Sequence, residues 1–441
     1  MIKKLFGTDG IRSLSNDEIF NDFSLNTLSQ SIIKNNKNLK IVVGRDTRDS
    51  SKRIENKLAN ALKNNGAKVL KVGLITTPAI SYLTKKLNCN IGIVVSASHN
   101  PYQFNGIKFF NKKGEKLSDS DENKIEKSFF DSKKVKEYRN NGVIQKINNS
   151  FSIYKNKFIK ILKKNNFSRK LKIVIDCANG SSYKIVKYIF SGININLIYI
   201  KDKPNGKNIN YKCGTLHIQS LIKKVKEKSA DFGISFDGDG DRIICCDEKG
   251  KIIDGDKILG CLTHYFLYKS KLRVNAMVGT TMTNRGLEKF INRMGLKFYK
   301  SKVGDKFVYE LMKKKKCFIG GEQSGHIILK EFGSSGDGIL IALYLIKIIS
   351  ESNKKTSQIF DLYNSYFQIQ KNIKLKDSLY KKNKKINNLV RNYNNKIISE
   401  NRILIRFSGT EPVIRLLVEG EKYCKINILA KRLSNKIKKS V

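Results

Sequence analysis

The chain has 441 residues, which at roughly 150 residues per domain corresponds to about three domains. Lys and Arg number 86 against 38 Asp and Glu, a net charge of +48, yet 40% of the residues are hydrophobic. That apolar content excludes a disordered polyelectrolyte, and 31 Gly and 4 Pro without a Gly-X-Y period exclude collagen-like and Pro-rich chains.

The sequence offers no membrane-directed or disulfide-forming segment. The longest apolar run, residues 338–349, is shorter than a bilayer span and is interrupted by Lys347. The first residues have only isolated apolar side chains and no signal-peptide core. Eight cysteines without a CxxC pair predict reduced, mostly buried thiols rather than a disulfide scaffold or a zinc site. We expect a cytoplasmic protein without a membrane partner.

The positive charge by itself would suit a nucleic-acid-binding protein. The lysines, however, lie along the whole chain, for example at 85–86, 223–224, 313–316 and 381–382. This distribution indicates a solvated lysine surface rather than one basic stripe, so we expect no nucleic-acid partner. Failure to bind DNA or RNA at low salt would dispose of that alternative.

Strand and helix patterns alternate through three successive regions, as in an α/β sheet. In the first region the strands are expected at 40–44, 68–72 and 91–95, with helices near 54–62 and 79–87. In the second, strands are expected at 172–176, 193–200 and 232–236, with helices from about 182 and at 216–228. In the third, strands are expected at 275–278, 297–300 and 318–320, with helices at 284–294 and 306–315.

The last seventy or so residues have a different pattern. Strands are expected at 365–373, 402–407 and 413–419, followed by a basic amphipathic helix from Ile426. The Lys/Asn-rich stretch 374–395 suits either a linker or a helix that covers a sheet. The predicted fold class is α/β, with three similar α/β domains at 1–150, 151–253 and 254–368 and a C-terminal α+β domain at 369–441.

A small-residue loop, Ser96-Ala-Ser-His-Asn-Pro101, follows the strand at 91–95. The carboxyl end of a strand is where α/β sheets place ligands. Ser98 offers a hydroxyl nucleophile, His99 could orient it, and Lys108 adds a cation nearby. The alternative is a Ser/Asn turn that caps a helix.

The segment Phe236-Asp-Gly-Asp-Gly-Asp-Arg242 alternates carboxylates with glycines. Asp237, Asp239 and Asp241 can point oxygens at one centre, which suits a hard cation such as Mg²⁺. An EF-hand counted from Asp237 would have its carboxylate at Glu248, but it needs glycine at position six, where this chain has Arg242. The remaining alternative is an acidic surface turn.

Two further loops carry polar groups. The third loop is Gly320-Gly-Glu-Gln-Ser-Gly-His326. Glu322 and Ser324 could hold sugar hydroxyls, and His326 could move a proton. A Gly-rich turn with a structural histidine has the same pattern. In Arg406-Phe-Ser-Gly-Thr-Glu-Pro412, with Arg415 after it, guanidinium, hydroxyl and backbone donors suit a phosphate monoester better than a plain turn does.

These four loops, in this order, resemble the α-D-phosphohexomutase superfamily, and among its members the bacterial enzymes that act on glucosamine phosphates. The resemblance covers nearly the whole chain. It also includes the segments Phe6-Gly-Thr-Asp-Gly-Ile-Arg12, Gly44-Arg-Asp-Thr-Arg48, Asp176-Cys-Ala-Asn-Gly180, Val303-Gly-Asp305 and Gly336-Asp-Gly338.

The resemblance implies a role for each site residue, in four domains around a central cleft. Ser98 would be the phosphoserine, and it would share one Mg²⁺ with Asp237, Asp239 and Asp241. Arg12, Lys108 and His326 would surround the reacting hydroxyl, and Arg242 would lie beside the metal loop in contact with substrate. Glu322 and Ser324 would hold the sugar. The non-reacting phosphate would be held by Arg406, Ser408, Gly409, Thr410 and Arg415.

The implied reaction interconverts glucosamine 6-phosphate and glucosamine 1-phosphate through a 1,6-bisphosphate, on the route to UDP-N-acetylglucosamine and the cell wall. Mannose or glucose phosphates are the alternative substrates, although Ser96 and Gln323 resemble the glucosamine members. Two residues depart from the family pattern, because Ser13 and Ser51 stand where relatives usually have glycine. The sequence leaves open the oligomeric state, a homo-oligomer included, and how Ser98 is first phosphorylated.

Overall fold

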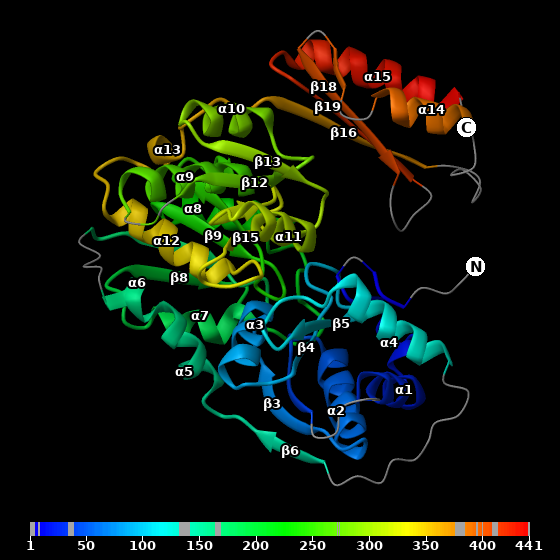
Figure 1. The fold of residues 1–441 in the computed structure, drawn as a ribbon. Coiled ribbons are helices and arrows are strands. Elements are labelled where there is room, and N and C mark those ends of the chain that lie inside the picture. Colours follow the sequence, from blue (N-terminus) through cyan, green and yellow to red (C-terminus); the bar gives the residue numbers. More distant parts are fainter. Residues whose placement is uncertain are drawn as a thin grey trace. The chain divides into compact units, whose positions relative to one another are not determined.

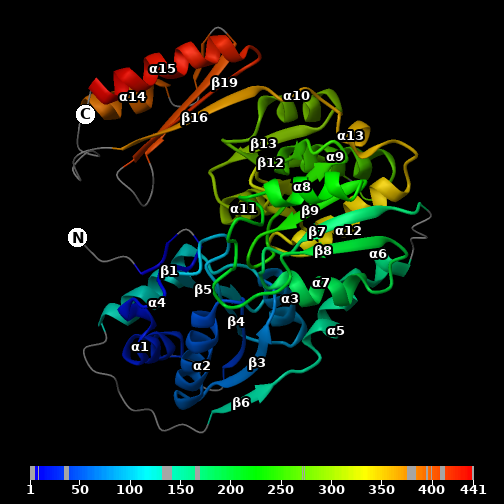
Figure 2. The ribbon, with the colours of Figure 1, turned by 180° about the vertical axis from the view of Figure 1, so that it is seen from behind.

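The computed structural model describes residues 5–7, 9–33, 39–131, 142–163, 169–270, 272, 274–374, 384–393, 396–398, 400–407 and 413–439. They form two compact units, one of Met1–Thr280 with Leu296–Leu362 and one of Thr281–Gly295 with Tyr363–Val441. The first unit contains three sheets and the second contains one (Figures 1 and 2).

The first sheet has the order β1-β5-β4-β2-β3-β6. Strands β2, β3, β4 and β6 run parallel, whereas β5 is antiparallel to β4 and β1 to β5. Its elements are β1 (Ile11–Leu14), α1 (Asp22–Ile33), β2 (Lys40–Arg45), α2 (Asp49–Asn64), β3 (Lys68–Leu74), α3 (Thr77–Lys86), β4 (Ile91–Val95), β5 (Phe104–Asn111), α4 (Asp119–Asp131) and β6 (Val143–Lys146).

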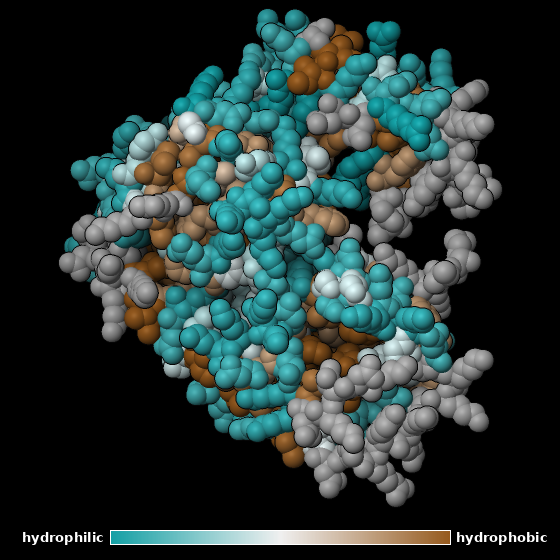
Figure 3. Space-filling model, viewed as in Figure 1, coloured by the Kyte–Doolittle hydropathy of each residue, from teal (hydrophilic) through white to brown (hydrophobic). Residues whose placement is uncertain are grey.

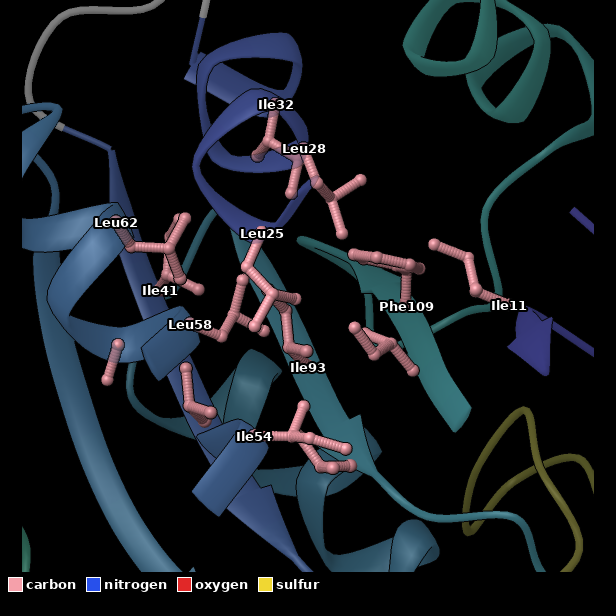
Figure 4. Close-up of a cluster of buried hydrophobic side chains, with 14 of the residues drawn as sticks. Ile11, Leu25, Leu28, Ile32, Ile41, Ile54, Leu58, Leu62, Ile93 and Phe109 are labelled. Atoms are coloured by element: carbon pink, nitrogen blue, oxygen red, sulfur yellow. The ribbon is translucent and has the colours of Figure 1, made fainter. Parts of the chain in front are cut away.

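Alternation along the central strands builds the two sides of this sheet. Ile41 and Ile93 join the core that α1 and α2 cover (Figure 4). Their neighbours on the other face include Gly44 and Gly92, which leave room for α3. A Cβ at Gly92 would lie 2.0 Å from the Thr84 hydroxyl oxygen, so the close approach of α3 requires glycine there.

The second sheet has the order β8-β7-β9-β10-β11 and the third has the order β13-β12-β14-β15. The first four strands of the second sheet and the four strands of the third follow the same order along the chain. Around the second sheet lie α5 (Ser150–Lys155), α6 (Ile159–Lys163), β7 (Lys172–Asp176), α7 (Ser182–Phe190), β8 (Asn196–Ile200), α8 (Gln219–Glu227), β9 (Phe232–Phe236), β10 (Ile243–Asp247) and β11 (Ile252–Ile253). The third region has α9 (Gly255–Tyr268), β12 (Ala276–Thr280), β13 (Lys297–Ser301), α11 (Asp305–Lys315), β14 (Ile319–Gly321), β15 (Ile327–Leu329), α12 (Gly338–Ser350) and α13 (Thr356–Ile359).

The repeat places three loops at equivalent positions. In each sheet three parallel strands are followed by an antiparallel one, and the loop of interest makes that reversal: β4 to β5, β9 to β10, and β14 to β15. The Ser98, Asp237–Asp241 and Glu322–His326 loops therefore leave the sheets at the same kind of strand end.

The second unit is α+β. Its antiparallel sheet has the order β16-β19-β18-β17. The elements are α10 (Arg285–Arg293), β16 (Phe367–Lys374), α14 (Lys384–Tyr393), β17 (Lys396–Ile398), β18 (Asn401–Phe407), β19 (Val413–Gly420) and α15 (Tyr423–Lys439). Helix α15 buries Ile426, Ala430, Leu433 and Ile437 against the sheet, a spacing that makes one helical face.

The α/β fold class and the C-terminal α+β region are confirmed, and the strands lie within a few residues of the expected ranges. The alternation did not reveal the antiparallel β5 and β15 or the helices α1 and α9. In the stretch 374–395 the helix interpretation holds for α14, where Val390 packs against the core of the unit. The apolar run at 338–349 is the buried helix α12.

Polar side chains predominate on one face of the molecule, and the cysteines form no disulfides. Hydrophilic side chains cover most of the face shown in Figure 3. All eight cysteines are free thiols, and seven of them are buried. None of the helices in the described part of the chain combines the length and apolar content that crossing a bilayer requires.

Candidate active site

Ser98 lies in the turn between β4 and β5, so the alternative of a helix cap is wrong. Its backbone has a left-handed φ of 51°, and its side chain is buried, with 1% of the residue exposed. The hydroxyl donates to Asp237 Oδ2 at 2.6 Å and lies 3.3 Å from His99 Nδ1. Burial, with help from the nearby Arg242 and Arg12, lowers the pKa of His99 to about 3, so this ring is neutral at pH 7.

The metal loop is buried, which excludes the acidic surface turn. Asp237, Asp239 and Asp241 each place a carboxylate oxygen within 4.8 Å of the others'. Among the described residues, one oxygen of Asp239 and one of Asp241 are buried without a hydrogen-bond partner. Burial and the two like charges raise the pKa of Asp237 well above its usual value. Buried carboxylates with free oxygens and too little counter-charge fit a divalent cation.

Glycine is needed at two positions of this loop. Gly240 has a φ of 73°, in the left-handed region. A Cβ at Gly238 would lie 2.5 Å from the carbonyl oxygen of Ser98. The alternation of aspartate and glycine therefore lets the metal loop pass directly against the Ser98 turn.

Lys108, in β5, joins the metal loop from the first domain. Its Nζ lies 2.9 Å from Asp239 Oδ2, 3.2 Å from Asp241 Oδ2 and 2.8 Å from Asp9 Oδ2. Burial works against the cation, but the three carboxylates outweigh it and raise the pKa of Lys108 well above its usual value. Thr77 assists by donating to Asp239 Oδ2 at 2.6 Å. These contacts offset only part of the negative charge of the aspartates.

His326 belongs to the same network through Asp305. Its Nε2 lies 3.0 Å from Asp305 Oδ2 and 2.9 Å from the backbone nitrogen of Gly336, while Nδ1 is 3.8 Å from Asp241 Oδ1. Nε2 can donate to Asp305 when it carries a proton and accept from Gly336 when it does not. Burial opposes the charged ring, but Asp305 and Asp241 outweigh it and raise the pKa of His326.

Four residues of this network were not predicted. Asp9 and Asp305 are both paired with Lys116, which lies 2.6 Å from Asp305 Oδ2. Thr77 begins α3 and reaches the metal loop from the first domain. The two aspartates lie in segments 6–12 and 303–305, which resemble the family, and this resemblance could have identified them as site residues. Lys116 and Thr77 had none, because each resembles an ordinary surface or cap residue.

The other predicted residues of the first unit surround this cluster. Arg12 lies 3.4 Å from Asn100 Oδ1 and from Asp9 Oδ2. The backbone N–H of Arg242 donates to Asp237 Oδ1 at 3.1 Å. Glu322 is buried and its Oε1 accepts from the N–H of Gly304 at 2.9 Å, whereas Ser324 is exposed. The predicted residues of the first three loops are thus brought to neighbouring turns.

In the second unit, Arg406 and Arg415 are opposite each other on β18 and β19. Burial and the charge of Arg415 lower the pKa of Arg406, and Arg406 Nε is buried without a hydrogen-bond partner among the described residues. Two adjacent guanidiniums of this kind are suited to an anion. Ser408, Gly409 and Thr410 lie outside the described residues.

The two departures from the family pattern differ in their surroundings. Ser51 is buried, donates to Asp46 Oδ1 at 2.7 Å and accepts from Asn105 Nδ2 at 3.0 Å. Ser13 makes an exposed hydrogen bond to Asp17 Oδ2 at 2.6 Å. Ser51 is therefore part of the support below the Ser98 turn, whereas Ser13 is half-buried and its hydroxyl makes an exposed hydrogen bond.

Comparison with known proteins identifies the class of this protein. Four phosphoglucomutase/phosphomannomutase models match in order: alpha/beta/alpha domain I at residues 3–136, domain II at 152–250, domain III at 254–366 and the C-terminal domain at 371–436. The chain belongs to the phosphoglucomutase/phosphomannomutase family. It is therefore an enzyme, an isomerase that acts on a sugar phosphate by phosphoryl transfer.

Individual relatives narrow this class. Proteins named phosphoglucosamine mutase from Nautilia profundicola and Caldicellulosiruptor bescii are 42% and 41% identical, each over 98% of this chain and 98% of the relative. A phosphoglucomutase/phosphomannomutase family protein from Burkholderia thailandensis has a similar solved structure, with a TM-score of 0.83, 21% identity and coverage of 100% of this chain and 97% of that one. The last likeness concerns the fold alone.

Proposed function

We propose that this enzyme interconverts glucosamine 6-phosphate and glucosamine 1-phosphate through phosphorylated Ser98 and a 1,6-bisphosphate. The relatives named phosphoglucosamine mutase, between 37% and 42% identical over nearly the whole chain, support this substrate. The observation that carries the mechanism is the buried Ser98 hydroxyl, 2.6 Å from a carboxylate of the aspartate triplet. The four domains at 1–150, 151–253, 254–368 and 369–441 are part of this proposal.

The aspartate triplet would hold one Mg²⁺ per chain, together with an oxygen of phosphorylated Ser98. Two buried carboxylate oxygens, on Asp239 and Asp241, have no hydrogen-bond partner in the described part of the chain, and they support this assignment. A divalent cation there would offset negative charge as the phosphoryl group moves. The oxygen-only ligand set favours Mg²⁺ over a softer metal.

Each transfer conserves the phosphoryl group. Starting from glucosamine 6-phosphate, the phosphorus–oxygen bond at Ser98 Oγ breaks and a bond to the sugar O1 forms, while O1 gives up its proton. The bisphosphate then reorients, the bond from phosphorus to O6 breaks, a bond from that phosphorus to Ser98 Oγ forms, and O6 takes up a proton. We assign proton movement to His326 and charge compensation to Lys108 and Arg12.

Substrate binding divides between sugar and phosphate. Glu322, Ser324 and Arg242 would contact the sugar. Arg406, Ser408, Gly409, Thr410 and Arg415 would hold the phosphate that is not reacting. Arg415→Ala loses charge-assisted bonds worth about 1.5 to 3 kcal/mol, so the Michaelis constant for glucosamine 6-phosphate should rise about ten- to hundredfold. An unchanged constant would mean that the phosphate is held elsewhere.

The decisive experiment compares glucosamine, mannose and glucose 6-phosphates in coupled assays with the purified protein. We expect the highest kcat/KM for glucosamine 6-phosphate, and a higher value for either other sugar would favour a phosphomannomutase or phosphoglucomutase. Intact mass with peptide mapping should find a phosphoryl group on Ser98. We further propose that the enzyme acts in the cytoplasm without a nucleic-acid partner. Cell fractionation tests the location. Gel filtration at low salt, with and without added DNA or RNA, tests nucleic-acid binding and gives the oligomeric state.

A further inference from the structure

The turn that carries Ser98 is held by its backbone carbonyl groups. The carbonyl oxygen of Ser98 accepts from Arg48 Nη2 at 3.2 Å and from Asn210 Nδ2 at 2.9 Å. The carbonyl oxygen of Asn100 accepts from the same two atoms, at 2.6 Å and 3.1 Å. Arg48 and Asn210 thus each donate to the same two carbonyls of this turn. The left-handed φ of 51° at Ser98 is disfavoured for a residue with a Cβ.

The two donors come from different domains. Arg48 stands before α2 in the first domain, and its guanidinium is fully buried against Asp46. Asn210 lies in the long connection between β8 and α8 in the second. Its own backbone N–H donates to the carbonyl of Ala178 at 2.9 Å, and a Cβ at Gly238 would lie 2.8 Å from its Nδ2. The Asn210 amide is therefore wedged between the metal loop and the Ser98 turn.

We propose that Asn210 is a positioning residue for phosphoryl transfer: its side-chain amide fixes the Ser98 turn against the metal loop and so holds Ser98 Oγ beside Asp237. This rests on the proposed function of Ser98. The hydrogen bonds from the Asn210 amide to the turn go to backbone carbonyls, so the amide would act on Ser98 through the backbone of the turn. Loss of the amide lets the strained turn relax and moves Oγ away from the carboxylates, which slows transfer rather than weakening substrate binding.

Substitutions at Asn210 are easier to interpret than substitutions at Arg48, because removing Arg48 would leave Asp46 as an unpaired buried charge. Asn210→Asp keeps the shape but replaces two donors with a carboxylate that faces two carbonyl oxygens. Asn210→Gly removes the amide and tolerates the left-handed φ of 57° found at this position. The matched control is Asn208→Asp in the same loop, whose amide donates instead to the carbonyl of Lys203 at 3.0 Å.

The measurement is the single-turnover rate at which Ser98 is phosphorylated by added glucosamine 1,6-bisphosphate, followed by intact mass, together with steady-state kcat and KM. We expect both Asn210 variants to lose at least tenfold in that rate and in kcat, with KM within twofold of wild type. Asn208→Asp should match wild type in all three. Circular dichroism and the thermal midpoint show whether each variant is folded.

The outcomes separate this inference from the proposed function. If wild-type Ser98 takes up no phosphoryl group, the proposed function fails. If the wild type is phosphorylated and folded Asn210→Gly keeps pace with it, Asn210 has no positioning role. An equal rise in KM for both Asn210 variants, with kcat unchanged, would also overturn the inference, because the residue would then act on substrate binding. If Asn210→Asp fails to fold, the glycine variant decides alone.

Discussion

The Ser98 turn and the Glu322–His326 turn each connect a parallel strand of their sheet to the antiparallel strand that follows it, yet they present their serines differently. Ser98 is 1% exposed and hydrogen-bonded to Asp237, whereas Ser324 is exposed. The first turn spans residues 96–103 and the second only 322–326. The longer turn packs against the metal loop, which supplies the carboxylate that accepts from the Ser98 hydroxyl.

This difference separates two tasks that a serine hydroxyl can perform. A covalent phosphoryl carrier benefits from a dry, fixed position, because water would otherwise compete for the phosphoryl group. A group that grips a substrate must remain accessible while substrate enters and leaves. Strand order therefore places the loops, but loop length and the contacts behind each loop decide its chemistry.

The largest effect is expected for Ser98→Ala. Without the hydroxyl there is no covalent carrier, so mutase activity should fall at least a thousandfold while the protein stays folded. A coupled assay and the thermal midpoint test both statements. Activity within about tenfold of wild type, a loss of only ~1.4 kcal/mol, would mean that another group carries phosphate.

Removing a metal-loop carboxylate should have the next largest effect. Asp239→Ala deletes an oxygen donor and the partner of Lys108 and Thr77, so we expect weaker Mg²⁺ binding and a hundredfold or greater loss of kcat. Titration calorimetry measures the binding. The control is Asp22→Ala, whose exposed carboxylate pairs only with Lys57 and which should behave as wild type. A wild-type rate that survives excess EDTA would contradict the metal assignment.

Sequence patterns predicted the two turns because each follows a short predicted strand and concentrates small and polar residues. They also predicted the triplet Asp237, Asp239 and Asp241, since alternating glycines leave few other uses for three carboxylates. The sequence patterns did not predict the antiparallel strands β5 and β15, because β15 has only three residues and β5 is buried along most of its length. Neither gives a clear period of two.

Contacts between side chains that are far apart in the chain could not be predicted from the sequence patterns. Lys116 resembles the neighbouring lysines Lys112 and Lys113, yet its side chain is half-buried and pairs with both Asp9 and Asp305. Asn210 lies 112 residues from Ser98 and still donates to its carbonyl. Local composition and periodicity report which face of an element is buried, not which loops meet across domains. Only the fold brings these residues together.

A smaller effect is expected for Ser324→Ala, the counterpart of Ser98→Ala in the third sheet. Loss of one hydrogen bond to the sugar, about 0.5 to 1.5 kcal/mol, should raise KM for glucosamine 6-phosphate about two- to tenfold with little change in kcat. The two serine variants measured side by side test the division of tasks. If Ser324→Ala lost kcat with KM unchanged, the exposed serine would take part in the chemistry.

The smallest effect on activity is expected for Ser51→Ala, below the Ser98 turn. Its hydroxyl joins Asp46 and Asn105, and Asp46 in turn accepts from Ser96 Oγ at 2.6 Å. Removing it leaves two buried polar groups each short of one partner, so the free energy of unfolding should fall by about 1 to 3 kcal/mol. Because Arg48 and Asn210 still hold the Ser98 carbonyl, kcat should stay within twofold.

The urea midpoint and kcat of Ser51→Ala should be measured beside those of Ser13→Ala, the other departure from the family pattern. Ser13 loses only an exposed bond to Asp17, so its midpoint should move by less than the equivalent of about 0.5 kcal/mol. A tenfold fall in kcat for Ser51→Ala would show that the support of the Ser98 turn runs through Asp46 and Ser51 rather than through its carbonyls. Equal midpoints for the two variants would show that the buried hydroxyl adds nothing to stability. Either result would change how the longer turn keeps its serine fixed while the shorter one leaves its serine exposed.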